Sequence, residues 1–450
     1  MTDESSVLDL PADPMGQAAG TMVCPVCGRG SEDQLVPFDE LSDDLKMLVS
    51  ANSTDGVEAV CRRCIDIFSR ARVQLEQDAA VFEHGGHVLS TPLRLDADDR
   101  FTGRGVTIAF LDSGFYPHPD LVTPKNRVLA YHSIVEDDKT KFHEPDVASW
   151  HGMMTSVVAA GNGSLSNGFY RGIAPDANVV LVKLAKSGKI SEHAIECGLK
   201  WVLDHKDKYG IRIVNISAGG DHESPYLHSS LCKTVERAVR EGLVVVCAVG
   251  NAGMHAGHPV LPPASSPSAI AVGGLDDQNS LDRARRGMYR SSYGPTVDGL
   301  QKPEVIAPGI WVAAPILPGT PTAEEAELIA TLDNAPDDQL RPIIEKHRLV
   351  DKDLYDSRDL RTPLLRQLIT IKLREENVIT EHYKYVDGTS FSAPIVASII
   401  ACMLEANPKL TPQKVKRLLI DTAERLPFIE VDRQGWGVVT PRRAVELAMK

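Results

Sequence analysis

Five short apolar runs recur between residues 105 and 274, and they limit the fold more than any other feature. The runs are 105–112, 177–184, 211–217, 243–250 and 268–274. They are rich in Val and Ile, and helix-like stretches at 151–160, 191–205 and 229–241 lie between them. Strands that are apolar on both faces and alternate with helices indicate a parallel sheet covered on both sides. We therefore expect an α/β fold, a three-layer sandwich with a mostly parallel central sheet.

Length and charge narrow the class of protein. A chain of 450 residues with 43% hydrophobic residues has room for one large α/β domain with additions. Its net charge is −13, and residues 1–100 hold 19 acidic against 8 basic residues. Such a surface repels phosphate backbones, so a nucleic-acid partner is not expected.

Two features of the sequence, its first residues and its most apolar windows, indicate where in the cell the protein is expected. The first twenty residues contain no basic segment followed by an apolar stretch, as a secretory signal would. The most apolar windows, "GLVVVCAVG" and "IVASIIACML", are shorter than the roughly 20 residues that span a membrane. We expect a cytoplasmic protein with no membrane partner, in which cysteines are thiols or metal ligands.

Composition shifts divide the chain into parts. Residues 1–20 form an acidic tail that we expect to be disordered, and 21–85 hold four cysteines and two amphipathic helical segments. A short linker containing His84 and His87 follows, and the α/β domain is predicted for 100–450. Residues 319–380 are helical and charged, so we interpret them as an insertion into that domain. Further helices are predicted to begin near Ser390, Thr411 and Thr440.

Four cysteines form two CxxC pairs near the N-terminus. Cys24 and Cys27 lie in "CPVCGRG", and Cys61 and Cys64 lie in "CRRC". Each CxxC turn can present two sulfurs to one metal, and four thiolates suit tetrahedral Zn²⁺. The arrangement resembles a small treble-clef or zinc-ribbon module, in which zinc would be structural. An iron site or unliganded thiols remain open alternatives.

The other cysteines and histidines show no metal-ligand spacing. We interpret Cys197, Cys232, Cys247 and Cys402 as core thiols because their neighbours are apolar. The histidines at 84, 87, 132, 143 and 382 are left without a metal role.

Three local patterns could carry nucleophilic catalysis. Asp112 ends an apolar run before a Gly turn, His151 opens a helix of small residues, and Ser390 opens another. A serine hydroxyl needs an imidazole to remove its proton, and the imidazole needs a carboxylate to orient it. The N–H groups at a helix start would stabilise the oxyanion, which favours Ser390 over Ser392, which lies two residues further into the helix. Each residue alone has a common structural interpretation as a turn former or helix cap.

Together the patterns resemble a known family. "IAFLDSGFYPHPDL", "HGMMTSVVAAG", "AVGNAG" and "GTSFSAP" occur in the order typical of subtilisin-like serine proteases, the subtilases. The resemblance covers residues 100–318 and 383–450. It implies a serine endopeptidase in which Asp112 orients His151, His151 is the general base and Ser390 is the nucleophile. It also implies that Asn251 belongs to the oxyanion hole.

The resemblance extends to substrate binding. Ser217, Ala218 and Gly219 match the strand that pairs with an extended substrate. Leu261 and Pro262 match the border of the pocket for the residue before the scissile bond, where Leu would favour small or medium apolar side chains.

The chain also departs from the family pattern. Met153 and Met154 follow the His-Gly pair where the family usually has Thr and His, and Ile395 replaces a frequent His. None of these changes removes a proton-transfer group. The loop 161–175 lacks carboxylates, so we do not predict the family's calcium site.

The added segments suggest control of the protease. No family-type inhibitory propeptide is recognisable in the sequence, and a cytoplasmic protease needs regulation. We expect a regulatory protein partner to bind the cysteine module or the insertion, which ends about eight residues before Ser390 and could act as a lid. The alternatives are an effector protease restricted to one partner, and a non-catalytic binding protein on the same fold.

Overall fold

The structure, a computed structural model, describes residues 23–27, 34–51, 53, 57–77, 88–135, 141–144, 146, 148–186 and 188–450. The predicted acidic tail and the linker with His84 and His87 lie outside these residues. The strands are β1 (Leu35–Pro37), β2 (Ala59–Cys61), β3 (Thr107–Asp112), β4 (Val128–Ser133), β5 (Asn178–Lys183), β6 (Ile211–Ile216), β7 (Val244–Ala248), β8 (Ile270–Asp276), β9 (Gly287–Met288), β10 (Val305–Pro308), β11 (Val312–Pro315) and β12 (Tyr383–Val386).

The α-helices lie between and around these strands. They are α1 (Asp43–Ala51), α2 (Arg62–Gln77), α3 (Thr91–Arg94), α4 (Pro119–Val122), α5 (Ser149–Ala160), α6 (Glu192–Tyr209), α7 (Ser230–Arg240), α8 (Pro321–Asn334), α9 (Leu340–Lys346), α10 (Lys352–Asp356), α11 (Thr362–Glu375), α12 (Thr389–Ala406), α13 (Pro412–Thr422), α14 (Val431–Gln434) and α15 (Pro441–Ala448).

The central sheet has the order β10-β8-β7-β6-β3-β5-β4, with the short β9 beside β8. All neighbours along this path are parallel, and only β9 is antiparallel. The five predicted runs correspond to β3, β5, β6, β7 and β8. The sheet therefore confirms the predicted α/β class, and it adds two strands at its edges, β4 and β10, that the apolar pattern does not reveal.

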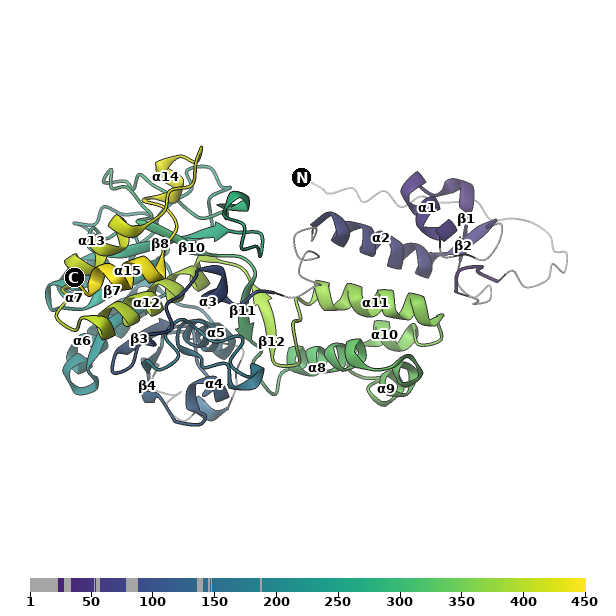
Figure 1. The fold of residues 1–450 in the computed structure, drawn as a ribbon, viewed down its shortest axis with the longest axis horizontal. Coiled ribbons are helices and arrows are strands. Elements are labelled where there is room, and N and C mark those ends of the chain that lie inside the picture. Colours follow the sequence, from purple (N-terminus) through teal and green to yellow (C-terminus); the bar gives the residue numbers. More distant parts are fainter. Residues whose placement is uncertain are drawn as a thin grey trace.

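Helices cover both faces of the sheet (Figure 1). One core lies between the sheet and α5, α12 and α15, and it contains Phe110, Met153 and Ile400. A second core lies on the opposite face against α6 and α7, and it contains Leu111 and Val235. Adjacent residues of β3 thus enter different cores, as the period of two in a strand requires. The three-layer arrangement leaves the carboxyl ends of the strands as the place for a site.

A separate lobe joins the cysteine segment to the helical insertion. One hydrophobic core contains Val60 and Phe68 from the cysteine segment together with Leu328, Leu340 and Leu365 from 319–380. Helix α2 lies alongside α11, away from the central sheet (Figure 1). Two segments about 250 residues apart in the chain therefore fold around the same apolar interior.

Polar contacts cross this shared interface. Arg70 Nε donates to Glu375 at 2.9 Å, and Arg70 also pairs with Asp353 at 3.0 Å. Arg63 pairs with the same Asp353 and donates to the Ser357 hydroxyl at 3.0 Å. Asp353 thus links two arginines of α2 to the insertion.

The ends of α6 show how local sequence sets the boundaries of a helix. The Ser191 side chain accepts a hydrogen bond from the Ala194 N–H at 3.2 Å, as an N-cap does. Gly210, with φ of 62°, ends the helix in the left-handed region, where glycine has no Cβ penalty.

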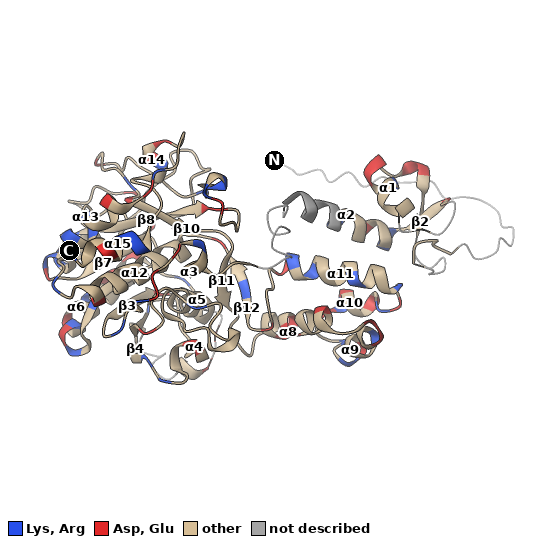
Figure 2. Cartoon of the chain, in the orientation of Figure 1, with Lys and Arg blue, Asp and Glu red and all other residues tan. Residues whose placement is uncertain are grey.

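Within the described part of the chain, α12 is the one helix whose length and apolar composition would suffice to cross a membrane. Its most apolar window is 83% buried inside the fold, as expected for a core helix. Figure 2 shows basic and acidic residues on the same helices, for example on α6, whereas α1 begins with Asp43 and Asp44.

Candidate active site and cysteine cluster

Asp112 and His151 are in direct contact at the carboxyl end of β3. His151 Nδ1 lies 2.7 Å from Asp112 Oδ1, and Asp112 is fully buried. The other carboxylate oxygen accepts from the Thr155 hydroxyl at 3.0 Å, and Oδ1 also accepts from the Ser113 N–H at 2.6 Å. The carboxylate is therefore held in one orientation, in which an Nδ1–H on His151 can donate to it.

The pKa of His151 reflects this contact. Burial disfavours the charged imidazolium, but the charge of Asp112 and the hydrogen bond to it outweigh that effect. The pKa of His151 is consequently raised above its usual value.

The close packing around residue 152 explains why a glycine follows His151. A Cβ built at Gly152 would lie 2.1 Å from the Gly114 carbonyl oxygen and 3.0 Å from the Asp112 Cβ. The first turn of α5 therefore lies against the turn after β3, at a separation that no side chain permits. This close approach places the imidazole beside the carboxylate.

Ser390 lies in the first turn of α12 and is partly exposed. Its hydroxyl donates a long hydrogen bond of 3.4 Å to the Ser217 carbonyl. Ser392 is fully buried and donates to the Pro308 carbonyl at 3.1 Å, so its hydroxyl faces the interior. Of the two serines in "GTSFSAP", only Ser390 has a hydroxyl that a substrate could reach.

Asn251 is oriented by Thr389, the residue before Ser390. Its Oδ1 accepts from the Thr389 N–H at 2.9 Å and from the Thr389 hydroxyl at 3.1 Å. A Cβ built at Gly388 would lie 3.5 Å from Asn251 Nδ2 and 3.8 Å from the Ser390 nitrogen. Two N–H donors thus flank one small space that glycine leaves open.

Ser217, Ala218 and Gly219 follow β6 and lie beside α12. The Ser217 hydroxyl donates to the Ser390 carbonyl at 2.8 Å. A Cβ at Gly219 would lie 3.8 Å from the Leu261 Cβ, and the Gly220 N–H donates to the Pro262 carbonyl at 2.6 Å. The two segments expected to bind substrate are therefore neighbours in the fold.

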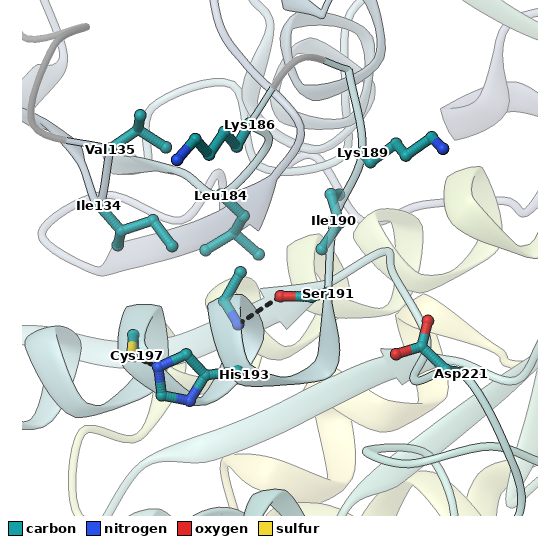
Figure 3. Close-up of a pocket in the computed structure, with 11 residues that line it drawn as sticks. Ile134, Val135, Leu184, Lys186, Lys189, Ile190, Ser191, His193, Cys197 and Asp221 are labelled. Atoms are coloured by element: carbon teal, nitrogen blue, oxygen red, sulfur yellow. Dashed lines mark hydrogen bonds between the residues drawn. The ribbon is translucent and has the colours of Figure 1, made fainter.

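A hollow of about 850 Å³ is lined in part by Asp221, which follows Gly219 by two residues (Figure 3). Ile134, Leu184 and Ile190 give it an apolar lining, and Lys186 and Lys189 lie on the side away from His193 and Cys197 (Figure 3). Such a hollow offers room for the side chains of a bound polypeptide.

The four N-terminal cysteines gather at one point. Their sulfur atoms all lie within 4.8 Å of one another, and all four residues are buried. Cys24 Sγ lies 4.0 Å from Cys64 Sγ, and Cys27 Sγ lies 3.6 Å from Cys61 Sγ. A disulfide needs about 2.05 Å, whereas sulfurs at about 2.3 Å from a tetrahedral metal lie roughly 3.8 Å apart. The donor set and its spacing therefore fit a metal ion.

Three of the four remaining cysteines are buried, as predicted. Cys232, Cys247 and Cys402 are buried, and burial raises the pKa of Cys247 and Cys402. The prediction of a core thiol is wrong for Cys197, which is partly exposed because it faces the hollow at Asp221, where its sulfur lies 3.4 Å from His193 Nε2.

Three of the histidines without a metal role fall within the described residues. His132 stacks on Trp201, with 4.5 Å between the ring centroids. His143 lies against Phe142, and His382 lies 3.8 Å from Glu381.

Asp120 is buried next to the loop for which calcium is not predicted. Its carboxylate accepts from the Tyr383 hydroxyl at 2.7 Å and from the Ser164 hydroxyl at 2.9 Å. Both hydroxyl groups thus hydrogen-bond to this carboxylate. The expectation that the loop 161–175 forms no calcium site remains a prediction.

Sequence reasoning missed two residues that support the site, Thr155 and Thr389. Thr155 lies four residues after His151, on the same face of a helix, so helical spacing could have identified it. Thr389 orients Asn251 from 138 residues away, and no local signal connects the two positions.

Comparison with known proteins agrees with this geometry. Residues 103–437 match the Subtilase family. The chain is 31% identical over 355 residues to serine protease AprX of Bacillus subtilis, covering 76% of this chain and 67% of AprX. It is 30% identical over 184 residues to the major intracellular serine protease of the same organism, covering 40% of this chain and about half, 54%, of that protein.

Solved structures show the same fold. The CspB protease of Clostridium perfringens has a TM-score of 0.57 at 16% identity, covering 81% of this chain and 97% of that one. Fervidolysin of Fervidobacterium pennivorans has a TM-score of 0.52 at 19% identity, covering 78% and 45%. With the sequence matches and the sheet topology, these comparisons show that the chain belongs to the subtilase family of subtilisin-like serine endopeptidases.

Proposed function

We propose that this chain hydrolyses peptide bonds with Ser390 as nucleophile, His151 as general base and Asp112 as the residue that orients the base. The contact between His151 Nδ1 and the buried Asp112 carboxylate carries the proposal. A donor at Nδ1 leaves Nε2 as the basic nitrogen that can accept the Ser390 proton. The long bond from Ser390 to Ser217 is weak enough for the hydroxyl to turn when substrate arrives.

The reaction follows from these positions. As Ser390 Oγ attacks the carbonyl carbon, its proton passes to His151, and Asp112 stabilises the imidazolium. The Ser390 N–H and the Asn251 amide donate to the oxyanion beside Gly388. His151 then gives its proton to the leaving amine. Water attacks the acyl-enzyme by the same route and restores Ser390.

The substrate of this reaction is an extended polypeptide. Its segment before the scissile bond pairs with Ser217, Ala218 and Gly219, which gives affinity with little sequence selectivity. Leu261 beside Gly219 shortens the adjoining pocket and favours small or medium apolar side chains.

The cysteine cluster takes a structural Zn²⁺ in this proposal. Cys24, Cys27, Cys61 and Cys64 would supply all four ligands, which leaves no open position for substrate. The ion would hold the turn with Cys24 and Cys27, the end of β2 and the start of α2 together, and so stabilise the lobe that these segments share with the insertion.

We also propose that the protein is cytoplasmic and that a regulatory protein binds the shared lobe. The common core of the cysteine segment and the insertion supports this, because α11 leads into β12 and β12 into Ser390. The same feature supports the narrower candidate, an effector protease restricted to one partner. Turnover of unfolded casein, compared with cleavage of single proteins in a cell extract, separates the two candidates.

Labelling with a fluorophosphonate serine probe tests the proposal. We expect the zinc-loaded protein and Ser392→Ala to be labelled and Ser390→Ala to be unlabelled, with all three proteins folded by circular dichroism. Labelling that persists in Ser390→Ala would refute the assignment. A folded wild type without labelling would favour a non-catalytic binding protein on this fold.

A further inference from the structure

A second hollow lies beside His151, where α5 meets the start of the insertion. It measures about 620 Å³, and its lining includes Trp150, Met154, Leu317, Pro321, Lys384 and Val386. Two of these residues flank His151 on α5, and Val386 precedes Ser390 by four residues. The Trp150 ring meets the His151 imidazole edge to face, with 5.1 Å between centroids. The hollow therefore opens next to the groups that handle the proton.

Part of its wall comes from the insertion. Thr320, Pro321 and Thr322 form the start of α8. Lys384 lies on β12, which follows the insertion and pairs with β11 in a separate two-stranded sheet. Lys384 and Val386 are two residues apart on one strand, so their side chains lie on the same face of it. This hollow is thus built jointly by the catalytic helix α5 and by the added segment.

The lining of the hollow is mostly apolar and includes the ammonium group of Lys384. Trp150, Met154, Leu317 and Val386 offer apolar surface. Asp146 also lines the hollow, but its carboxylate pairs with Lys183 at 2.8 Å. Within the described part of the chain, the Lys384 ammonium forms no direct hydrogen bond or ion pair, although its charge acts on the Glu325 carboxylate of α8. The lining thus favours an apolar group with a negative charge close by.

The proposed mechanism determines which part of a bound substrate would lie at this hollow. The acyl half of the scissile bond lies at Ser390 and along Ser217–Gly219. The leaving amine must face His151, because His151 protonates it. The chain that continues from that amine therefore passes Trp150 and enters the hollow.

We propose that this hollow binds the two residues that follow the scissile bond, with preference for a large apolar residue followed by an acidic one. The proposal rests on the serine protease function proposed above. The apolar side chain lies against Trp150, Met154 and Leu317, and the carboxylate pairs with Lys384. The insertion then contributes to substrate selection through the start of α8 and β12.

Internally quenched peptides test this inference. They share one sequence before the scissile bond and continue with Leu-Glu, Leu-Lys, Gly-Glu or Gly-Lys. A p-nitroanilide with the same acyl half lacks both residues, and its kcat/KM normalises each enzyme preparation. We expect wild type to favour Leu-Glu over Leu-Lys by about five- to twenty-fold, and Leu-Glu over Gly-Glu by a similar factor.

Two charge reversals complete the test. Lys384→Glu should invert the preference, so that Leu-Lys becomes the better substrate. Lys352→Glu, on the exposed start of α10, is the matched control and should keep the wild-type ratio. Equal ratios in wild type and Lys384→Glu, with the anilide still cleaved, would overturn this inference and leave the proposed function standing. Failure to cleave anilide and peptides alike would overturn both.

Discussion

The backbone N–H of Thr389 donates a 2.9 Å hydrogen bond to Oδ1 of Asn251, and the Thr389 hydroxyl donates to the same oxygen at 3.1 Å. Because that oxygen is occupied, the amide nitrogen of Asn251 faces the space beside Gly388 and the Ser390 N–H. The residue before the proposed nucleophile thus sets the orientation of a group proposed to bind the oxyanion.

Replacing Asn251 should slow the chemical step. We expect Asn251→Ala to lower kcat by about 10²–10³-fold, the range known for loss of such a donor in subtilisin, with KM little changed. Thr389→Val keeps the backbone N–H and loses the hydroxyl, so its loss should be smaller, near ten-fold. Steady-state kinetics on one anilide measures both. An unchanged kcat in Asn251→Ala would remove Asn251 from the oxyanion hole.

The pH dependence of the reaction should report His151. Burial alone would lower the pKa of His151, but the charge of Asp112 and the hydrogen bond to it raise that pKa overall. The imidazole therefore stays protonated to a higher pH than an ordinary histidine. A protonated imidazole cannot accept the Ser390 proton, so kcat/KM should rise with pH through a midpoint above about 6.5.

Asp112→Asn provides the check on this assignment. It removes the charge, and we expect the midpoint to move down while kcat falls by about 10⁴-fold. A midpoint that stays in place would mean that another group controls the acid limb.

Gly152→Ala should disrupt the site through packing alone. The added Cβ would meet the Gly114 carbonyl oxygen at 2.1 Å, so α5 must move away from the turn after β3. We expect a loss of about 1–3 kcal/mol in unfolding free energy and loss of most probe labelling. Gly287→Ala is the control, because the nearest atom to its Cβ is 3.9 Å away. Equal labelling of both variants would contradict the close-approach explanation.

Metal content tests the cysteine cluster. We expect about one zinc per chain by mass spectrometry, and strongly reduced content in Cys64→Ser because a three-thiolate set binds zinc less tightly. Cys197→Ser should retain the metal. A chelator should lower the unfolding temperature of the lobe. Equal metal content in Cys64→Ser and wild type would show that these thiols do not hold the ion.

Asp353 offers a test of the shared lobe. It pairs with both Arg63 and Arg70 across the interface between α2 and the insertion. Asp353→Ala should destabilise that interface by about 1–3 kcal/mol and speed hydrogen exchange in α2. Asp359→Ala, at an exposed residue of the insertion, serves as control. Unchanged exchange in α2 would show that apolar packing alone holds the two segments together.

Residue spacing predicted much of the α/β fold for a physical reason. A strand buried on both faces must be apolar throughout, so β3, β5, β6, β7 and β8 stand out in the sequence. The edge strand β4 is only partly buried, and the short β10 ends at Pro308, so neither leaves that signal. The two cysteine pairs were equally visible, since ligand spacing is a local property.

The amino-acid sequence by itself indicated the layered class and the two cysteine pairs, because apolar runs and ligand spacing lie within short segments. The candidate triad was implied by the resemblance of four short motifs to the subtilases, and those motifs are also local. Only the tertiary structure decided that the cysteine segment and the insertion share one core, that Thr389 orients Asn251, and that Lys384 lies in a hollow beside Trp150. Those relationships join residues far apart in the chain. They depend on which apolar faces find each other during folding, and no local pattern of residues records that choice.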